Sequence, residues 1–234
     1  MKHTWWTKLL GLLGLGRNAS SIVSSEAEDM TLPVQDRLSL TKNGQLRPVE
    51  NPVGGDESLY RAIEQSRPPV ETSGGLRLSV SHIDWAGTRG VSVNRSKFSK
   101  PEDLHYTLAD PDLGWAEAKA ADIPSAKEIE IPATTGQKSQ IEHHFAICGN
   151  QKLTIEVSHD PAASSTTSDG RALPENYAHT AIQLQLSAFG PFEKIPPFLL
   201  DLIRDEGDWF RFHLAEAFHV RKVPSPKLPV SGEV

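Results

Sequence analysis

The amino-acid sequence predicts an α+β fold: an antiparallel sheet of two hairpins plus one or two strands, packed by C-terminal helices, with a disordered N-terminal arm. Three observations support this prediction. Apolar and polar residues alternate in segments 76–94 and 139–159, each interrupted by a turn. Apolar residues recur at helical spacing after Pro196-Pro197. The chain before residue 76 is rich in proline, glycine and polar residues and shows no sustained period.

The first hairpin is predicted from residues 76–81 and 91–94. Leu76, Leu78 and Val80 alternate with arginine and serine, which is the period of a half-buried strand. Residues 86–90 read Ala-Gly-Thr-Arg-Gly, a composition typical of a turn. A short helix is expected to follow at Pro101, with Ser99 as its candidate N-cap.

The second hairpin has its turn at residues 149–151, and two registers are available. A two-residue turn would place small or polar residues opposite Leu153 and Ile155. A three-residue turn pairs Ile147 with Leu153, Phe145 with Ile155 and His143 with Val157. Because a slip of one residue exchanges the two faces of a strand, the three-residue turn alone gives one continuous apolar face, and we predict it.

The C-terminal half is predicted as loop, strand and helices. Residues 161–176 form a long Ser/Thr/Pro loop, a type that is either mobile or functional, and alternation at 180–187 predicts a further strand. A helical stripe follows at Phe198, Leu199, Leu202 and Ile203 and ends at Gly207. Residues 209–220 fit both periods, and we predict a helix because Ala-Glu-Ala at 215–217 has poor strand propensity.

These elements divide the chain into four parts. They are an amphipathic helix at 1–16, a disordered linker arm at 17–75, a folded α+β domain at 76–223 and a disordered tail at 224–234. Within the arm, Leu59 and Ile63 share a face of one short helix over residues 57–65.

Composition limits the classes of function. The formal net charge of -6 over 234 residues argues against nucleic acid as a partner, because phosphate binding needs a basic surface. The single cysteine, Cys148, forms no internal disulfide and favours a reducing, cytoplasmic location. No apolar run approaches the ~18 residues of a transmembrane helix. The short run at 9–16, closed by Arg17, leaves a signal peptide as the less favoured alternative.

The N-terminal helix is the predicted binding element. Its apolar face carries Trp5, Trp6, Leu9, Leu10, Leu12 and Leu13, and Lys8 lies on the opposite face. Tryptophans and leucines on one face, with basic residues nearby, are typical of a helix that lies in a membrane interface or binds a partner. The alternative is a frayed tail or a helix docked on its own domain, because three glycines weaken it.

Four groups of residues suggest chemistry. Asp110 and Asp112 before Glu117-Ala118-Lys119 are similar to the acidic pair and Glu-x-Lys of metal-dependent nucleases, but the segment is predicted as a turn into a short helix with a solvated face. His144 and Cys148 are too far apart on a strand to share a zinc ion. The other two groups are the diagonal pair His143 and His159, and His82 with Asp84. None completes a site, so we predict no catalytic residue, metal or cofactor.

The layout resembles that of rhabdovirus matrix proteins. The residues that carry the resemblance are the tip Lys8-Leu9-Leu10-Gly11-Leu12 and the order of tip, proline-containing arm and compact domain. The resemblance implies an α+β domain and a structural role at a membrane in virion assembly.

Three functional hypotheses follow. The first is a non-enzymatic peripheral membrane or assembly/adaptor protein that binds through residues 1–16. The second is an acidic binding protein of the inhibitor or immunity type. The third is an enzyme with an unfamiliar site, which requires His82, Asp84, His143 and His159 to gather in one cleft.

Overall fold

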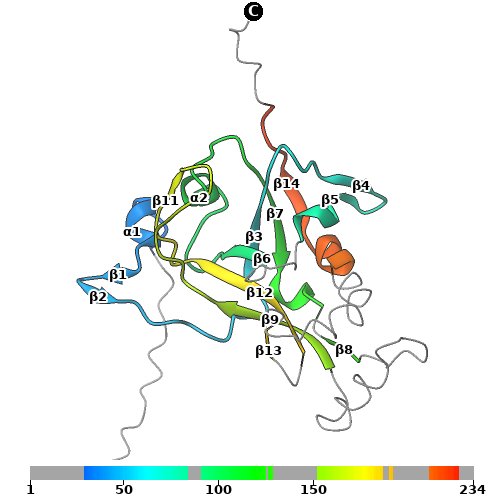
Figure 1. Ribbon diagram of the computed structural model, residues 1–234, viewed down its shortest axis with the longest axis horizontal. Coiled ribbons are helices and arrows are strands. Elements are labelled where there is room, and N and C mark those ends of the chain that lie inside the picture. The colour runs from blue at the N-terminus through cyan, green and yellow to red at the C-terminus, as the bar shows by residue number, and fades with distance from the viewer. Residues whose placement is uncertain are drawn as a thin grey trace, which may run out of the picture.

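The structure is a computed structural model, and its described residues are 29–83, 91–124, 126–128, 152–186, 190–191 and 211–226. These residues confirm the α+β class, with one large antiparallel sheet, two small two-stranded sheets and short helices (Figure 1). The large sheet has ten strands in the order β4-β5-β14-β7-β3-β6-β12-β9-β8, and β13 pairs with β12.

The large sheet is built from segments spread over the whole described chain. Its strands are β3 (Ser58–Ile63), β4 (Val70–Thr72), β5 (Gly75–Arg77), β6 (Val91–Arg95), β7 (Gly114–Lys119), β8 (Ala126–Glu128), β9 (Lys152–His159), β12 (His179–Leu186), β13 (Gly190–Pro191) and β14 (His219–Lys222). The small sheets are β1 (Thr41–Lys42) with β2 (Gln45–Leu46), and β10 (Ser165–Thr166) with β11 (Ala172–Leu173). The helices are α1 (Val34–Leu38), α2 (Asp103–Thr107), the 3-10 turns η1 (Val80–His82) and η2 (Ala120–Asp122), and a helical segment at residues 211–217.

The predicted hairpin of residues 76–81 and 91–94 is wrong. β5 pairs with β4 and β14, whereas β6 pairs with β3 and β12. The alternation misleads because the chain leaves the sheet at Leu78, where the Ser79 hydroxyl accepts a hydrogen bond from the Ser81 N–H and opens η1. Leu78 is therefore buried in the core, while Leu76 stays 39% exposed.

Of the predicted second hairpin, only the second strand is described, as β9, and residues 139–151 lie outside the described part of the chain. β9 pairs with β12 along its length and with β8 at its start. At Leu153 both edges of β9 are already paired, with Leu186 of β12 on one side and Lys127 of β8 on the other. The predicted pairing of Leu153 with Ile147 is therefore wrong. The three residues of β8 are too few to show a period, and no pattern in the sequence indicates them.

The predicted disordered arm is wrong for residues 29–75, which fold with the domain; residues 1–28 lie outside the described chain. β3 lies between β6 and β7, and its Leu59 and Ile63 are fully buried. The predicted helix at 57–65 is therefore also wrong. A four-residue spacing fits a helix face and a strand face equally well, so the pattern did not distinguish the two.

Polar contacts add to apolar ones such as the buried Leu38 in holding the arm in place. Arg37 of α1 forms a buried ion pair with Asp103 of α2 at 2.6 Å. Arg95 of β6 forms an ion pair with Glu57 at 2.6 Å and donates to the Glu50 carbonyl. Such contacts leave no periodic pattern in a sequence, which explains why composition alone predicted disorder.

The C-terminal half follows its predictions more closely. β12 confirms the strand predicted at 180–187. The helix chosen for 209–220 is confirmed over residues 211–217 and is wrong for residues 219–220, which begin β14. The predicted loop at 161–176 contains the β10–β11 hairpin. The helix expected after Pro101 is α2, but Ser99 donates to the Arg95 carbonyl instead of capping it. Residues 192–210 lie outside the described chain.

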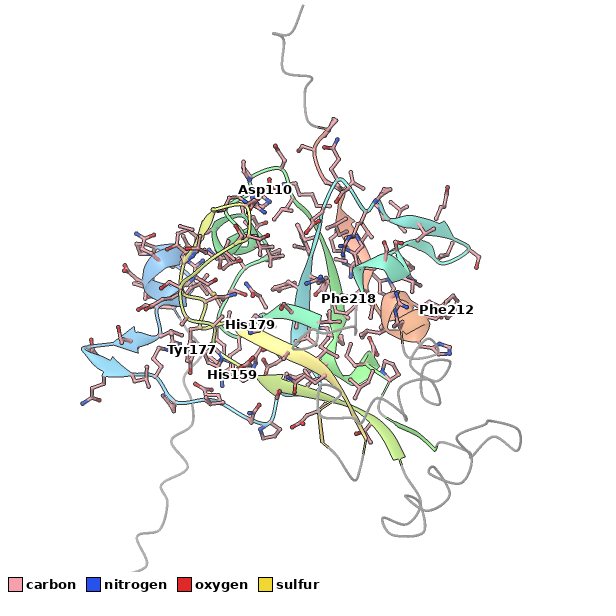
Figure 2. All side chains as sticks on the ribbon, viewed as in Figure 1. Asp110, His159, Tyr177, His179, Phe212 and Phe218 are labelled. Atoms are coloured by element: carbon pink, nitrogen blue, oxygen red, sulfur yellow. The ribbon has the colours of Figure 1, made fainter. Side chains whose placement is uncertain are left out.

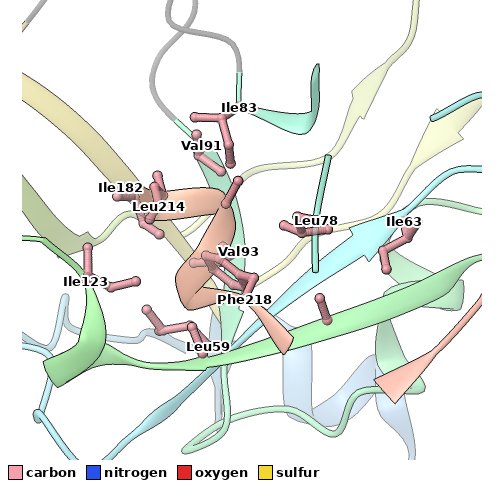
Figure 3. Close-up of a cluster of buried hydrophobic side chains, with 13 residues drawn as sticks. Leu59, Ile63, Leu78, Ile83, Val91, Val93, Ile123, Ile182, Leu214 and Phe218 are labelled. Carbon is pink, nitrogen blue, oxygen red and sulfur yellow. The ribbon is translucent and has the colours of Figure 1, made fainter. Parts of the chain in front are cut away.

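The main core lies on one face of the large sheet, beneath the helix at 211–217. Val91, Val93 and Ile182 from β6 and β12 pack there against Leu214 and Phe218 (Figure 3). All of these side chains are at most 2% exposed, so this face provides most of the apolar burial. In the described residues, no helix is long and apolar enough to cross a bilayer.

Candidate functional site

The predicted membrane- or partner-binding residues lie outside the described chain. They are Trp5, Trp6, Lys8, Leu9, Leu10, Leu12 and Leu13. The same holds for Asp84, His143, His144 and Cys148 among the residues considered for catalysis or metal binding.

The two described histidines of the enzyme hypothesis are bound to the backbone. His82 is 2% exposed, and its Nε2 lies 2.6 Å from the Arg67 carbonyl oxygen. His159 accepts the Glu50 N–H at Nδ1 and places Nε2 2.6 Å from the Tyr177 carbonyl oxygen (Figure 2). Burial lowers the pKa of both histidines. With both ring nitrogens of His159 hydrogen-bonded, that residue joins the backbone of Glu50 to that of Tyr177, just before β12, and has no free ring nitrogen to act as a base.

Glu117 and Lys119 belong to β7, so the helix predicted there is wrong. Ala116 and Ala118 alternate with them and are buried, which is strand periodicity. Ser58 joins the two polar side chains, because its hydroxyl donates to Glu117 at 2.6 Å and accepts from Lys119 at 2.8 Å. Burial raises the pKa of Glu117, but hydrogen bonds from Ser58 and Arg221 outweigh it and the net shift is downward.

The acidic pair Asp110 and Asp112 lies in a different place, where both residues line the outer of two neighbouring pockets that together we call the cleft. This outer pocket has a volume of about 730 Å³ and lies between the turn after β3, the turn after α2 and the β10–β11 hairpin. Figure 2 shows Asp110 beside that hairpin. The volume falls in the range of ~300–1,000 Å³ that is common for ligand pockets.

The outer pocket carries uncompensated negative charge. Asp169 pairs with Arg171 at 3.0 Å, and a hydrogen bond from Thr167 lowers the pKa of Asp169. Over the described ranges, the other three carboxylates of the pocket form no ion pair: Glu64, Asp110 and Asp112. No group of three or more possible ligands among the described side chains is arranged to hold a metal ion.

A smaller inner pocket of about 190 Å³ continues the cleft. Both pockets are lined by Leu108, which follows α2, and by Leu173 of β11. The inner pocket reaches the sheet, where Asn94 of β6 and His179 of β12 line it together with Asn176. The base of the β10–β11 hairpin closes it, since residues 162, 163, 165, 173 and 174 also belong to the lining.

Two asparagines that line the inner pocket are buried, and each has one side-chain amide atom without a hydrogen-bond partner among the described residues. The Asn176 amide donates to Asn94 Oδ1 at 2.8 Å. Asn94 Nδ2 and Asn176 Oδ1 have no hydrogen-bond partner among the described residues. The two residues are 2% and 8% exposed, respectively. Buried polar atoms in native structures are nearly always paired with protein groups or with ordered water, so these two atoms are exceptions among the described residues.

Sequence reasoning identified part of this cleft. It singled out Asp110 and Asp112 for their charge, and it singled out the 161–176 loop for its length. It missed Glu64, Asn94 and Asn176, because nothing in their local sequence distinguishes them from ordinary surface residues.

Comparison of the chain with protein-family models, with curated proteins and with solved structures gives no match.

Proposed function

We propose that the protein is a non-enzymatic binding protein that holds a basic segment of a partner protein in the cleft, and so acts in assembly or as an adaptor. The observation that carries this proposal is the set of three carboxylates without ion pairs around the outer pocket: Glu64, Asp110 and Asp112. Negative charge in a concave site attracts cations and raises their rate of association.

An extended cation fits this pocket better than a single metal ion. Among the described side chains, the carboxylates are not grouped for metal coordination. They come from two separate turns, one after β3 and one after α2. Lysine or arginine side chains spaced along a peptide reach such separated charges, and the 730 Å³ pocket accommodates several side chains.

The test is binding of a labelled basic peptide, acetyl-Lys-Lys-Gln-Lys-Lys-amide, measured by fluorescence anisotropy at fixed ionic strength. We expect saturable binding that the double variant Asp110→Asn/Asp112→Asn weakens about fivefold to thirtyfold, since each charge pair contributes roughly 0.5–1 kcal/mol. The matched control is Asp36→Asn/Glu71→Gln, which removes the same charge from exposed positions outside the cleft. Equal weakening in both double variants would show that overall charge, and not the cleft, attracts the peptide.

A second candidate function is attachment to a membrane surface through residues 1–16. Trp5, Trp6 and the leucines of that segment support it, as does its resemblance to the tip of rhabdovirus matrix proteins. We expect the full chain to co-sediment with anionic liposomes and a full-length Trp5→Ala/Trp6→Ala variant to remain in the supernatant. Co-sedimentation that is unchanged in the variant would exclude this anchor.

A further inference from the structure

The inner pocket differs from the acidic outer pocket because most of the surface that faces its cavity is apolar. Leu108 and Leu173 line both pockets, and both side chains are half-buried, so part of each is open to a ligand. Ala62, Val93 and Leu104 complete much of the inner wall. A segment bound in the outer pocket therefore lies beside an apolar cavity.

The polar side chains of the inner pocket already have partners within the protein. The Arg61 guanidinium donates to the carbonyls of Ser92 at 2.8 Å and His82 at 3.3 Å. The Nδ1 atom of His179 lies 2.5 Å from the Asp160 carbonyl oxygen. The unpaired amide atoms of the two asparagines are shielded from solvent, and so from a ligand. A polar ligand group would lose hydrogen bonds to water here and gain few in return.

The charges around the inner pocket disfavour an ion of either sign. The Arg61 guanidinium belongs to the lining, and it repels a lysine or arginine side chain. The three carboxylates of the neighbouring outer pocket repel an anion. The surroundings therefore favour an uncharged, apolar group.

We infer that the inner pocket is a subsite for one aliphatic side chain, of about the size of leucine, within the partner's basic segment. This inference rests on the proposed function, because the basic residues on either side of the leucine bind the outer pocket. The volume of about 190 Å³ is below the ~300–1,000 Å³ of sites for whole ligands, so it suits one side chain. In an extended peptide, lysines two positions from the leucine point to the same side as the leucine, toward the cleft.

The experiment compares four labelled peptides, acetyl-Lys-Lys-X-Lys-Lys-amide with X as leucine, alanine, glutamine or glutamate, on the unaltered full chain. We expect the leucine peptide to bind about tenfold more tightly than the alanine and glutamine peptides, which carry the same charge and bury less apolar surface. Added salt should weaken all four peptides, because it screens the carboxylates. The ratio of leucine to glutamine affinities should stay constant, because burial of apolar surface involves no charge.

Two variants locate the leucine in the inner pocket. Leu173→Asn replaces an apolar wall with a polar side chain of similar size, and Ala163→Phe adds a ring at an exposed position of the lining. Each should lower the leucine-to-glutamine ratio to about threefold or less while the glutamine peptide still binds, which shows that the variant is folded. The matched control is Leu76→Asn, at a leucine that is 39% exposed on β5 outside the cleft, and it should leave the ratio near ten.

The outcomes separate this inference from the proposed function. If the leucine and glutamine peptides bind alike to the unaltered chain, and Asp110→Asn/Asp112→Asn weakens both, the cleft stands and the aliphatic subsite is overturned. A leucine preference that persists in both Leu173→Asn and Ala163→Phe places the side chain elsewhere and also overturns the subsite. Tightest binding of the glutamate peptide would make the inner pocket an anion site, with the same consequence. If no peptide in the series binds, the proposed function fails and the subsite fails with it.

Discussion

The two sides of the large sheet differ in how completely their side chains are packed, hydrogen-bonded or paired with an opposite charge. On the core side, Leu59, Ile182 and Phe218 are fully buried and belong to one apolar cluster (Figure 3). On the side covered by α2 and the β10–β11 hairpin, the cleft contains carboxylates without ion pairs and the half-satisfied amides of Asn94 and Asn176. The first arrangement lowers the free energy of the fold, and the second raises it.

With the cleft as the proposed binding site, this difference separates stability from binding within one sheet. Ligand-binding sites are commonly less stable than the rest of a fold, because their charged and polar groups have no interaction partner until the ligand binds. Substitutions on the core side should therefore change the free energy of unfolding. Substitutions in the cleft should change affinity and leave stability nearly constant.

The largest expected effect is at Phe218, between the helix at 211–217 and β14. Phe218→Ala removes a fully buried aromatic ring and should lower the free energy of unfolding by about 3–5 kcal/mol. Phe212→Ala is the matched control, since Phe212 lies on the helix at 211–217 and is 52% exposed (Figure 2), and it should change stability by no more than about 0.5 kcal/mol. Urea unfolding measures both, and equal losses would place the core elsewhere.

The next effect tests the attachment of the N-terminal segment. Arg37→Ala leaves the Asp103 carboxylate buried without its guanidinium and should cost about 3 kcal/mol. Replacing both partners, as Arg37→Met/Asp103→Leu, should restore most of that loss. The exposed pair of Arg171 and Asp169 is the control, and Arg171→Ala should cost at most about 1 kcal/mol. A small effect of Arg37→Ala would mean that residues 29–50 do not depend on this pair.

The sequence predictions were accurate where apolar packing determines the structure and inaccurate where polar contacts determine it. Where apolar residues set the structure, the pattern was sufficient: the alternation at 180–187 predicted β12, and Leu214 with Phe218 predicted a helix that packs on the core. Where side-chain charges set the structure, the pattern failed. Arg37 joins α1 to Asp103, and Arg95 and His159 both bind the backbone of Glu50, so each contact joins residues distant in the sequence.

The candidate site was predictable only in outline. Asp110 and Asp112 stand out by charge, and the 161–176 loop stands out by length. The cleft exists because α2 and that loop cover neighbouring parts of the sheet, and their positions depend on long-range strand order. β6 lies between β3 and β12, an arrangement that puts Asn94 beside Asn176, and no local period of the sequence indicates it.

A smaller effect is expected from pH, through the buried histidines. Burial lowers the pKa of His82 and His159 in the folded state below the usual value near 6.5. Below that value the unfolded chain binds more protons than the folded chain. The stability contributed by the neutral histidines is therefore fully present above about pH 6.5 and is lost as pH falls toward the folded-state pKa values, by up to about 1.4 kcal/mol per pH unit for each histidine.

Chemical denaturation between about pH 5 and 7 measures this loss, because carboxylates with ordinary pKa values near 4 titrate below that window. Protonated His159 has no lone pair left to accept the Glu50 N–H, so hydrogen exchange at Glu50 should accelerate over the same window. His159→Gln should reduce the pH dependence, because it removes the imidazole whose burial lowers its pKa. A stability that is flat across the window would refute the role of both buried histidines.

The smallest expected effect is the most informative about the cleft. Asp110→Asn/Asp112→Asn removes two carboxylates that form no ion pair in the described structure, so the free energy of unfolding should stay within about 0.5 kcal/mol or rise slightly as mutual repulsion is relieved. In the unaltered chain the backbone N–H of Asp112 donates to Asp110 Oδ1 at 3.0 Å, and the amide oxygen that Asp110→Asn introduces can accept the same bond, which keeps the turn after α2 intact. Urea unfolding at low and high salt measures the change. A loss above about 1 kcal/mol would mean that the acidic turn stabilises the fold, and the contrast between a stabilising face and a binding face would no longer hold.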